Sequence, residues 1–327
     1  MNWLRVSVLV TGGAGCIGGR LCERLVALGA DVTTIDNLDS GYTWRLPSAI
    51  KSFVQGSILD EKALSHAFDY QPQVVFHLAA LFANQNSLDH PEQDLAVNGL
   101  GTLRVLERSI RCRAARLVYA SSSCVYGDAI AEHSGANRLA ACARTPYQAT
   151  KFLGEQYAQI FSNRLSIVTA RIFNCYGPGD VPGKYRSVVP NFVASALRDE
   201  PINVHGEGTD TRDYTYVDDV VEGLLQSALA ARAPGRTYDI GSGVETSVLS
   251  LATMIRSLCA SKSPIFNVPK REWDVVRRRR ADTETASEDL GWTAKVDLSF
   301  GLAATIKWQR SYGEKTEATS TPARSPS

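Results

Sequence analysis

The chain has 327 residues, of which 44% are hydrophobic, and its 35 Lys and Arg residues almost balance its 34 Asp and Glu residues to a net charge of +1. This length is enough for one large hydrophobic core with a smaller lobe, and the nearly neutral charge argues against nucleic acid or an acidic membrane surface as a partner. The sequence has no long apolar run and no signal-peptide pattern, which predicts a cytoplasmic protein. Its seven cysteines contain no C-x-x-C pair, which predicts that the protein has no metal site and no disulfide framework.

A glycine-rich segment follows the first apolar run of the chain. Residues 6–10 have the composition of a strand, and leucines at helical spacing follow the glycines, so this order predicts a strand, a tight turn and a helix. Gly12 and Gly15 would let the backbone approach a pyrophosphate at the helix N-terminus, and Gly18 would let the helix pack closely on the strand. The spacing is G-x-x-G-x-x-G rather than the G-x-G-x-x-G of the standard dinucleotide fingerprint.

The second predicted strand ends in an acidic residue. Residues 32–35 are apolar or β-branched and lead directly into Asp36. A carboxylate at this place can accept hydrogen bonds from a ribose 2′-hydroxyl and repel a 2′-phosphate. The two motifs together predict a dinucleotide site that prefers NAD to NADP.

Strand-like and helix-like segments alternate along the next part of the chain. Strand-like runs occupy residues 74–78, 117–119 and 166–170, and helical patterns cover residues 93–111 and 147–161. Such alternation predicts an α/β fold with a Rossmann-like doubly wound parallel sheet that helices cover on both faces.

The pattern loosens after Asn174. Pro and Gly residues mark a loop at 178–183, and a helix is predicted at 188–197. A further helix at 216–230 and a strand at 238–240 have the composition of the earlier sheet and its helices. The chain is therefore expected to leave the first domain and to return to it.

The predicted domain organisation follows from these changes. We expect an NAD-binding Rossmann domain at 1–174 with later returns near 213–242, and a mostly substrate-binding C-terminal lobe at 175–312. Residues 313–327 are rich in Glu, Lys, Thr, Ser and Pro without apolar periodicity, which predicts a disordered tail.

A Tyr and a Lys lie four residues apart in the segment from Tyr147 to Lys151, and on the predicted helix they share one face. An unperturbed Tyr has a pKa near ~10 and is a poor base at neutral pH, but a lysine cation joined by an oxidised nicotinamide favours the phenolate. Tyr147 is thus a candidate general base for an alcohol, although many surface helices carry such a pair.

The glycine turn, the acidic strand end and the Tyr-x-x-x-Lys pair together resemble the extended short-chain dehydrogenase/reductase family, in particular its nucleotide-sugar (UDP-hexose) epimerases and its dehydratases. The resemblance runs from about Val6 to about Trp308. Further segments of the family stand in the expected order, at residues 77–80, 98–102, 119–127, 171–178 and 212–219. The resemblance implies NAD as cofactor and a homodimer.

The resemblance also implies roles for particular residues. Tyr147 matches the base, Lys151 the lysine that binds the nicotinamide ribose and lowers the pKa of the phenol, and Ser122 the residue that hydrogen-bonds the reacting hydroxyl. The residues expected to hold NAD are Gly12, Gly15, Cys16, Ile17, Gly18, Asp36, Asn37, Ser57, Ile58, Leu78, Ala79, Ala80, Asn98, Tyr147, Lys151 and Phe173. Ser57 departs from the family, which usually has an Asp there for adenine, and this predicts weaker retention of NAD.

The substrate implied by the resemblance is a nucleotide sugar, with UDP as the commonest nucleotide. The residues expected to contact it are Ser122, Ser123, Asn174, Val189, Val204, His205, Arg212, Arg271 and Arg279. Arg212 and Arg271 match a pair that clamps the diphosphate, a role suited to a forked and permanently charged group. Arg279, within the arginine run 277–280, matches the position near the C2 or C6 substituent, where it could pair with the carboxylate of a uronic acid. His205 matches a wall residue.

Ser123 and Cys124 distinguish between the reactions of this family. Members that eliminate water across C5 and C6 carry an Asp and a Glu at these two places, and UDP-glucuronate decarboxylases carry a Glu at the second. A hydroxyl and a thiol, whose pKa is near ~8.5, are poor replacements for carboxylates, whereas reversible oxidation at C4 needs neither. We therefore predict an NAD-dependent 4-epimerase of a UDP-hexose, UDP-hexosamine or UDP-hexuronate. The alternatives are a UDP-glucuronate decarboxylase, an NDP-sugar 4,6-dehydratase and a non-catalytic NAD-binding sensor.

Overall fold

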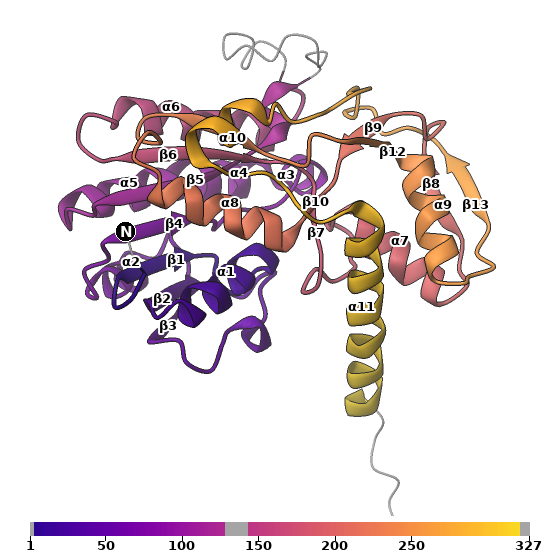
Figure 1. Ribbon diagram of the computed structural model, residues 1–327, viewed down its shortest axis with the longest axis horizontal. Helices are drawn as coiled ribbons and strands as arrows, with labels where there is room; N and C mark the ends of the chain where they lie inside the picture. The colour runs from indigo at the N-terminus through magenta and orange to yellow at the C-terminus, as the bar shows by residue number, and fades with distance from the viewer. Residues whose placement is uncertain (1–2, 128–142, 321–327) are drawn as a thin grey trace, which may run out of the picture.

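A computed structural model describes residues 3–127 and 143–320 of the chain. Its centre is a seven-stranded parallel sheet in the order β11-β6-β5-β4-β1-β2-β3 (Figure 1). The strands of this sheet are β1 (Ser7–Thr11), β2 (Asp31–Asp36), β3 (Ser52–Gln55), β4 (Val74–His77), β5 (Arg116–Ser122), β6 (Ile167–Ile172) and β11 (Thr237–Ile240). The strand order reverses between β1 and β4, and open α/β sheets bind ligands outside the carboxyl ends of the strands at such a point.

Helices cover both faces of the sheet, because alternate residues of each strand point to opposite faces. In β1, Val8 and Val10 are fully buried in one hydrophobic core and Leu9 is fully buried in the other. The helices of the first core are α1 (Cys16–Ala27), α8 (Val217–Leu229) and α10 (Glu284–Leu290), and those of the second are α2 (Glu61–Phe68), α5 (Thr102–Arg111) and α6 (Pro146–Ile160).

A smaller lobe lies beside the sheet and has its own core (Figure 1). Its elements are α7 (Val188–Leu197), β8 (Ile202–His205), β9 (Thr211–Asp213), β12 (Glu245–Ser247), α9 (Val248–Leu258), β13 (Ile265–Val268) and α11 (Leu298–Ser320). Strands β8 and β13 pair in parallel, and β9 and β12 pair antiparallel. Figure 1 shows the parallel pair of β7 (Cys175–Tyr176) and β10 (Thr215–Tyr216) at the junction of sheet and lobe.

Short helices follow the carboxyl ends of three sheet strands. They are η1 (Thr43–Arg45) after β2, α3 (Asn84–Asp89) and α4 (Pro91–Asp94) after β4, and η3 (Ser123–Tyr126) after β5. Between α4 and α5 the chain forms a π-helical turn at Leu95–Gly101. Residues 93–111, which were predicted as a helix, are helical throughout, and the π turn divides them into α4 and α5.

The observed architecture confirms the predicted fold class, a doubly wound parallel sheet with a smaller lobe. Strand β11 pairs with β6 at one edge of the sheet, and α7 spans the residues predicted for it. Helix α11 continues to Ser320, beyond residue 313 where the tail was predicted to start, and residues 321–327 lie outside the described part of the chain. Within the described ranges, every helix is too short or too polar to span a bilayer.

Candidate active site

The glycine-rich turn between β1 and α1 packs closely against the segment that follows β4. Gly12 has a φ of +74°, which favours glycine, and a Cβ placed there would lie 2.7 Å from the backbone nitrogen of Ala79. A Cβ on Gly18 would collide with the carbonyl oxygen of Gly12. Both positions therefore require glycine for the turn to close.

The first turn of α1 can receive an anion. Its N-cap residue, Gly15, offers no side-chain hydrogen bond, and the turn contains no acidic residue. The N–H groups of Cys16, Ile17 and Gly18 have no carbonyl partner within the helix, and the helix dipole adds a positive potential at this end. The turn therefore fits a pyrophosphate group.

Asp36 lies beside this turn at the end of β2. Its carboxylate accepts hydrogen bonds from the backbone nitrogens of Ala14, at 2.9 Å, and Leu38, at 2.8 Å. Burial raises the pKa of this carboxyl, and the two backbone hydrogen bonds oppose the rise. An acidic group held next to a phosphate-binding turn suits the ribose of NAD and disfavours a 2′-phosphate, so the residues present fit this cofactor.

Asn98 organises the segment after β4 that was predicted to contact NAD. The side chain is buried, its Oδ1 accepts from the backbone nitrogen of Leu81 at 2.8 Å, and its Nδ2 donates to the carbonyl oxygen of Leu81 at 3.1 Å. This fixes the chain next to residues 78–80. Asn37, in contrast, is exposed and donates its Nδ2 to Asp39 at 2.6 Å.

Two predicted cofactor residues are part of the hydrophobic interior. The side chains of Ile58 and Phe173 are 4% and 0% exposed, which leaves mainly their backbone atoms for contact with a cofactor. The hydroxyl of Ser57 accepts a hydrogen bond from the backbone nitrogen of Leu59 at 3.1 Å. The sequence does not show which side chains point into the core, because this depends on tertiary packing.

Ser122, Tyr147 and Lys151 lie together at the carboxyl end of β5. The strand ends at Ser122, and α6, which is capped by Thr145, carries Tyr147 and Lys151 on one face. The Nζ of Lys151 lies 5.8 Å from the centre of the Tyr147 ring. It donates a hydrogen bond to the carbonyl oxygen of Ala120 at 2.9 Å, so β5 fixes the position of the ammonium group.

Burial dominates the acid–base properties of these residues. Tyr147 and Lys151 are 5% and 4% exposed. Burial raises the pKa of the Tyr147 phenol well above its ordinary value, and its hydrogen bond with Ser122 acts in the opposite direction. Burial also lowers the pKa of Lys151 from an ordinary value of 10.5 to about 8. Burial therefore outweighs the hydrogen bond with Ser122 in the protein alone. The lowering of the phenol pKa predicted from the sequence also requires the charge of an oxidised nicotinamide.

The two residues that follow Ser122 are buried and neutral. Ser123 and Cys124 are each 4% exposed. Burial raises the pKa of the Cys124 thiol, and its hydrogen bond with Ser122 opposes the rise. A protonated thiol and a hydroxyl cannot act as the pair of carboxylates that elimination across C5 and C6 requires.

A cleft of about 400 Å³ is lined by residues of both the sheet domain and the smaller lobe. The predicted substrate residues that line it are Asn174, Val189, His205, Arg212, Arg271 and Arg279. Ser122 and Ser123 are not among the lining residues. The side chain of Val204, another residue predicted to contact the substrate, is 0% exposed in the core of the lobe, and strand alternation directs its neighbours Asn203 and His205 of β8 to the cleft.

The arginines of the cleft are held by neighbouring groups. Arg212 forms an ion pair with Asp274 at 2.8 Å, and the Nη2 of Arg279 donates to the carbonyl oxygen of Gly127 at 3.0 Å. Arg271 lines the same wall. These forked cations are suited to phosphate or carboxylate oxygens.

Several cleft residues were not predicted from the sequence. Phe82 and Gln85 belong to the segment after β4, and Trp273 of the lobe donates its Nε1 to the Oε1 of Gln85 at 2.9 Å. Lys184 and Arg186 come from the loop before α7. For Lys184 and Arg186, the sequence offered one signal, which was the presence of basic residues inside a Pro- and Gly-rich loop. For Gln85 and Trp273 it offered none, because a contact between residues so far apart in the chain leaves no local pattern.

Comparison with known proteins identifies the family of the chain. The sequence profile of the NAD dependent epimerase/dehydratase family matches residues 8–241. The chain belongs to this family. As a member of the NAD dependent epimerase/dehydratase family it is an enzyme that uses NAD, which confirms the predicted family and cofactor.

Similar proteins extend over nearly the whole chain. The UDP-glucose 4-epimerase of Mycolicibacterium smegmatis is 36% identical over 310 residues, which cover 92% of this chain and 98% of that protein. The UDP-N-acetyl-alpha-D-glucosaminuronate decarboxylase of Bacillus cytotoxicus is 32% identical over 315 residues, which cover 92% and 97% of the two chains. The solved structure of an epimerase from Methanothermobacter thermautotrophicus matches with a TM-score of 0.93 at 42% identity and covers 97% of this chain and 96% of that one.

Proposed function

We propose that this protein is an NAD-dependent nucleotide-sugar 4-epimerase that acts on a UDP-hexose, UDP-hexosamine or UDP-hexuronate. The observation that carries the proposal is the group of Ser122, Tyr147 and Lys151 next to Ser123 and Cys124, which supply no carboxylate. Membership in the epimerase/dehydratase family and the similarity to a UDP-glucose 4-epimerase over most of both chains support it.

Three side chains handle the proton of the C4 hydroxyl in this proposal. Bound NAD supplies the acceptor and then the donor of hydride, and its oxidised ring adds a positive charge. Tyr147 takes the proton from the C4 hydroxyl and returns it when the opposite configuration forms. Ser122, which hydrogen-bonds Tyr147, orients the reacting hydroxyl, and Lys151 stabilises the phenolate. Because both directions use one base, no second acid is needed.

The predicted binding residues take distinct roles in the same proposal. The turn at Gly12 and the first turn of α1 hold the pyrophosphate of NAD, and Asp36 holds a ribose. In the cleft, Arg212 and Arg271 bind the diphosphate of the substrate. Arg279, next to Gly127, lies at the sugar end, where it can pair with the carboxylate of a hexuronate.

Elimination and decarboxylation fit this site less well. A decarboxylase is among the similar proteins, but Cys124 stands at the position where the family resemblance implies a Glu for that chemistry. The raised pKa of the Cys124 thiol keeps it protonated at neutral pH, so it is a weak base for a proton on carbon. Reversible oxidation at C4 makes no demand on this residue.

We also propose that the enzyme is a cytoplasmic homodimer. Leu95 and Leu100 on the π-helical turn are 56% and 45% exposed, and Ile160 at the end of α6 is 64% exposed. The π-helical turn and α6 pack against each other, so these large apolar side chains lie on neighbouring helices. Exposed apolar groups on adjacent helices are typical of a surface that a second copy covers.

Proton NMR of the products tests the proposed activity. The purified protein, supplied with NAD, is incubated with UDP-glucose, UDP-N-acetylglucosamine and UDP-glucuronate, and we expect the C4 epimer of at least one of them. Tyr147→Phe should abolish turnover while NAD still binds, and Tyr157→Phe, on the same helix but outside the group, should keep full turnover. A 4-keto-6-deoxy sugar or released carbon dioxide would contradict the proposed reaction, and an active Tyr147→Phe would contradict the proposed base.

A further inference from the structure

Two loops from different parts of the protein are joined by two arginines that reach in opposite directions. One loop follows β2, and the other leads into α7 and lines the cleft. Arg45, in the first loop, donates its Nη2 to the carbonyl oxygen of Gly179 in the second. Arg186, in the second loop, donates its Nη2 to the carbonyl oxygen of Ser40 in the first, at 2.7 Å. We call these two side chains and the two carbonyl groups they reach the arginine clasp.

Arg45 also holds the glycine-rich turn. It is buried, and its Nη1 donates to the carbonyl oxygen of Ala14 at 3.1 Å. The same oxygen accepts from the backbone nitrogen of Tyr42 at 2.9 Å, and the backbone nitrogen of Ala14 donates to Asp36. The guanidinium carbon lies 4.8 and 4.9 Å from the ring centres of Tyr42 and Trp44, which fixes its plane. One side chain thus connects the phosphate-binding turn, the loop after β2 and the loop of the cleft.

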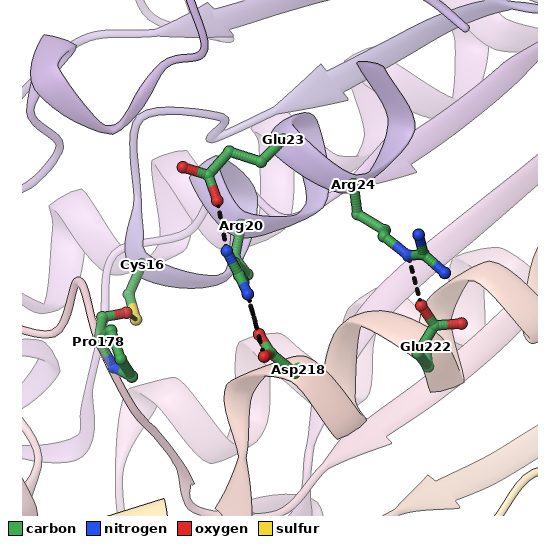
Figure 2. Close-up of polar contacts among 7 residues, drawn as sticks. All are labelled: Cys16, Arg20, Glu23, Arg24, Pro178, Asp218 and Glu222. Atoms are coloured by element: carbon green, nitrogen blue, oxygen red, sulfur yellow. Dashed lines mark hydrogen bonds and ion pairs between the residues drawn. The ribbon is translucent and has the colours of Figure 1, made fainter. Parts of the chain in front are cut away.

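The loop of the cleft has further contacts that hold it against the same region. Ser187, next to Arg186, donates its hydroxyl to Asp180 at 2.7 Å, and Asp180 is 7% exposed. Cys16, the first residue of α1, donates its thiol to the carbonyl oxygen of Pro178 at 3.9 Å (Figure 2). This loop therefore contacts the first turn of α1, which fits the pyrophosphate of NAD, as well as the loop that directly follows Asp36.

We propose that Arg45 and Arg186 are positioning residues that keep NAD bound and couple its retention to the occupancy of the cleft. This inference rests on the proposed function, in which one cofactor molecule must serve both the oxidation at C4 and its reversal. The clasp ties the loop after β2 to a loop whose Arg186 lines the substrate cleft. In this proposal a ligand bound in the cleft holds the cleft loop in place and so strengthens the clasp. Linkage then requires each ligand to raise the affinity of the other by the same factor, and we expect this gain to appear as slower release of NADH. The clasp also offsets the weaker retention expected from Ser57.

The rate of NADH dissociation tests the clasp directly. The enzyme is loaded with NADH and mixed with excess NAD in a stopped-flow fluorimeter, and the fluorescence change reports release. Arg186→Gln removes one charge-assisted hydrogen bond and should release NADH about tenfold faster than the wild type. Arg20→Gln is the matched control, because Arg20 pairs with Asp218 of α8 at 2.5 Å, outside the clasp (Figure 2), and its rate should stay within about twofold of the wild type.

A second variant tests whether the two arginines act together. Arg45→Lys keeps the charge but loses the forked geometry that reaches Ala14 and Gly179. It should also release NADH faster, and combining it with Arg186→Gln should add little, because each change already opens the same clasp. A wild-type rate in Arg186→Gln would overturn the proposal, whether or not Arg45→Lys folds.

UDP separates the clasp from the proposed function. Saturating UDP should slow NADH dissociation from the wild type about fivefold, and Arg186→Gln should lose most of this effect. UDP that binds the wild type without changing the rate would overturn the coupling. UDP that does not bind at all would overturn the proposed substrate class, while the rates of Arg186→Gln and wild type without nucleotide would still decide the role of the clasp in NAD retention.

Discussion

Replacing Glu155 by Gln should destabilise the folded protein by about 3 to 5 kcal/mol, because it leaves the guanidinium of Arg171 buried without its counter-charge. Glu155 accepts hydrogen bonds from the Nε and Nη2 of Arg171 at 2.9 and 2.7 Å, and from the hydroxyl of Ser121 at 2.5 Å. Both charged side chains are 7% exposed. The pair joins α6 to β5 and β6 beside Ser122 and Lys151, two residues of the proposed catalytic group, so it supports the geometry of that edge.

The size of the effect follows from the donors that meet the carboxylate. A glutamine has one acceptor oxygen, and its amino group would face a guanidinium donor. Arg171 cannot easily turn to another partner, since its Nη1 already donates to the hydroxyl of Tyr126 at 2.9 Å, which in turn donates to Asp239 at 2.6 Å. Burial raises the pKa of Asp239 to about 6, so this carboxylate is ionised at pH 7. Because the hydroxyl of Tyr126 lies between the two groups, the negative charge of Asp239 does not contact the Arg171 guanidinium directly.

Guanidinium chloride unfolding at pH 7, followed by circular dichroism, measures the loss of free energy of unfolding. Glu222→Gln is the matched control, because Glu222 pairs with Arg24 at 2.7 Å on the surface, with side chains 40% and 47% exposed (Figure 2), and should cost about 0 to 1 kcal/mol. Replacing Glu155 by Leu together with Arg171 by Met should recover most of the loss. Equal losses for Glu155→Gln and Glu222→Gln would refute the argument from burial.

Three further predictions concern the active site and the proposed dimer. The pKa of Lys151 is about 8 in the folded protein and 10.5 ordinarily, so the unfolded chain holds this proton more tightly between pH 8 and 10.5 and the free energy of unfolding should rise with pH across that window. Denaturant titrations at pH 8 and pH 10 should show this rise for the wild type and not for Lys151→Met. The same change in free energy between the two pH values for both proteins would count against the burial of the Lys151 charge. Ser122→Ala should lower kcat about 100-fold with little change in KM, measured with the epimerised sugar, since it removes the group that orients the hydroxyl; an unchanged kcat would exclude that role. Leu100→Glu combined with Ile160→Glu should convert the proposed dimer to a monomer in light scattering, because charges would replace exposed apolar contacts, and a dimer that persists would place the interface elsewhere.

Local pattern was enough to predict the sheet and the positions where polar residues meet. Asp36 and Ser122 both end a strand of the parallel sheet, and parallel strands bring their carboxyl ends to one edge. The four-residue spacing of Tyr147 and Lys151 predicted that they share one face of a helix, because residues four apart on a helix lie side by side. These inferences need only the chain order and the repeat of each element.

The orientation of single side chains could not be predicted from the sequence. Val204 and Phe173 have fully buried side chains, and the neighbours of Val204 in β8 face the cleft in its place. A strand residue points inward or outward according to the surface that packs on each face, and this depends on elements far away in the chain.

The sequence by itself determined the order of the elements, the class of sheet, the glycine positions of the turn and the absence of carboxylates at residues 123 and 124, because these depend on residue type and local spacing. Only the tertiary structure decided that burial raises the pKa of Tyr147, that Arg186 lines the cleft and that Arg45 reaches Gly179. Burial and contacts between residues far apart in the chain arise when the two lobes pack together, and neither leaves a periodic signal along the chain.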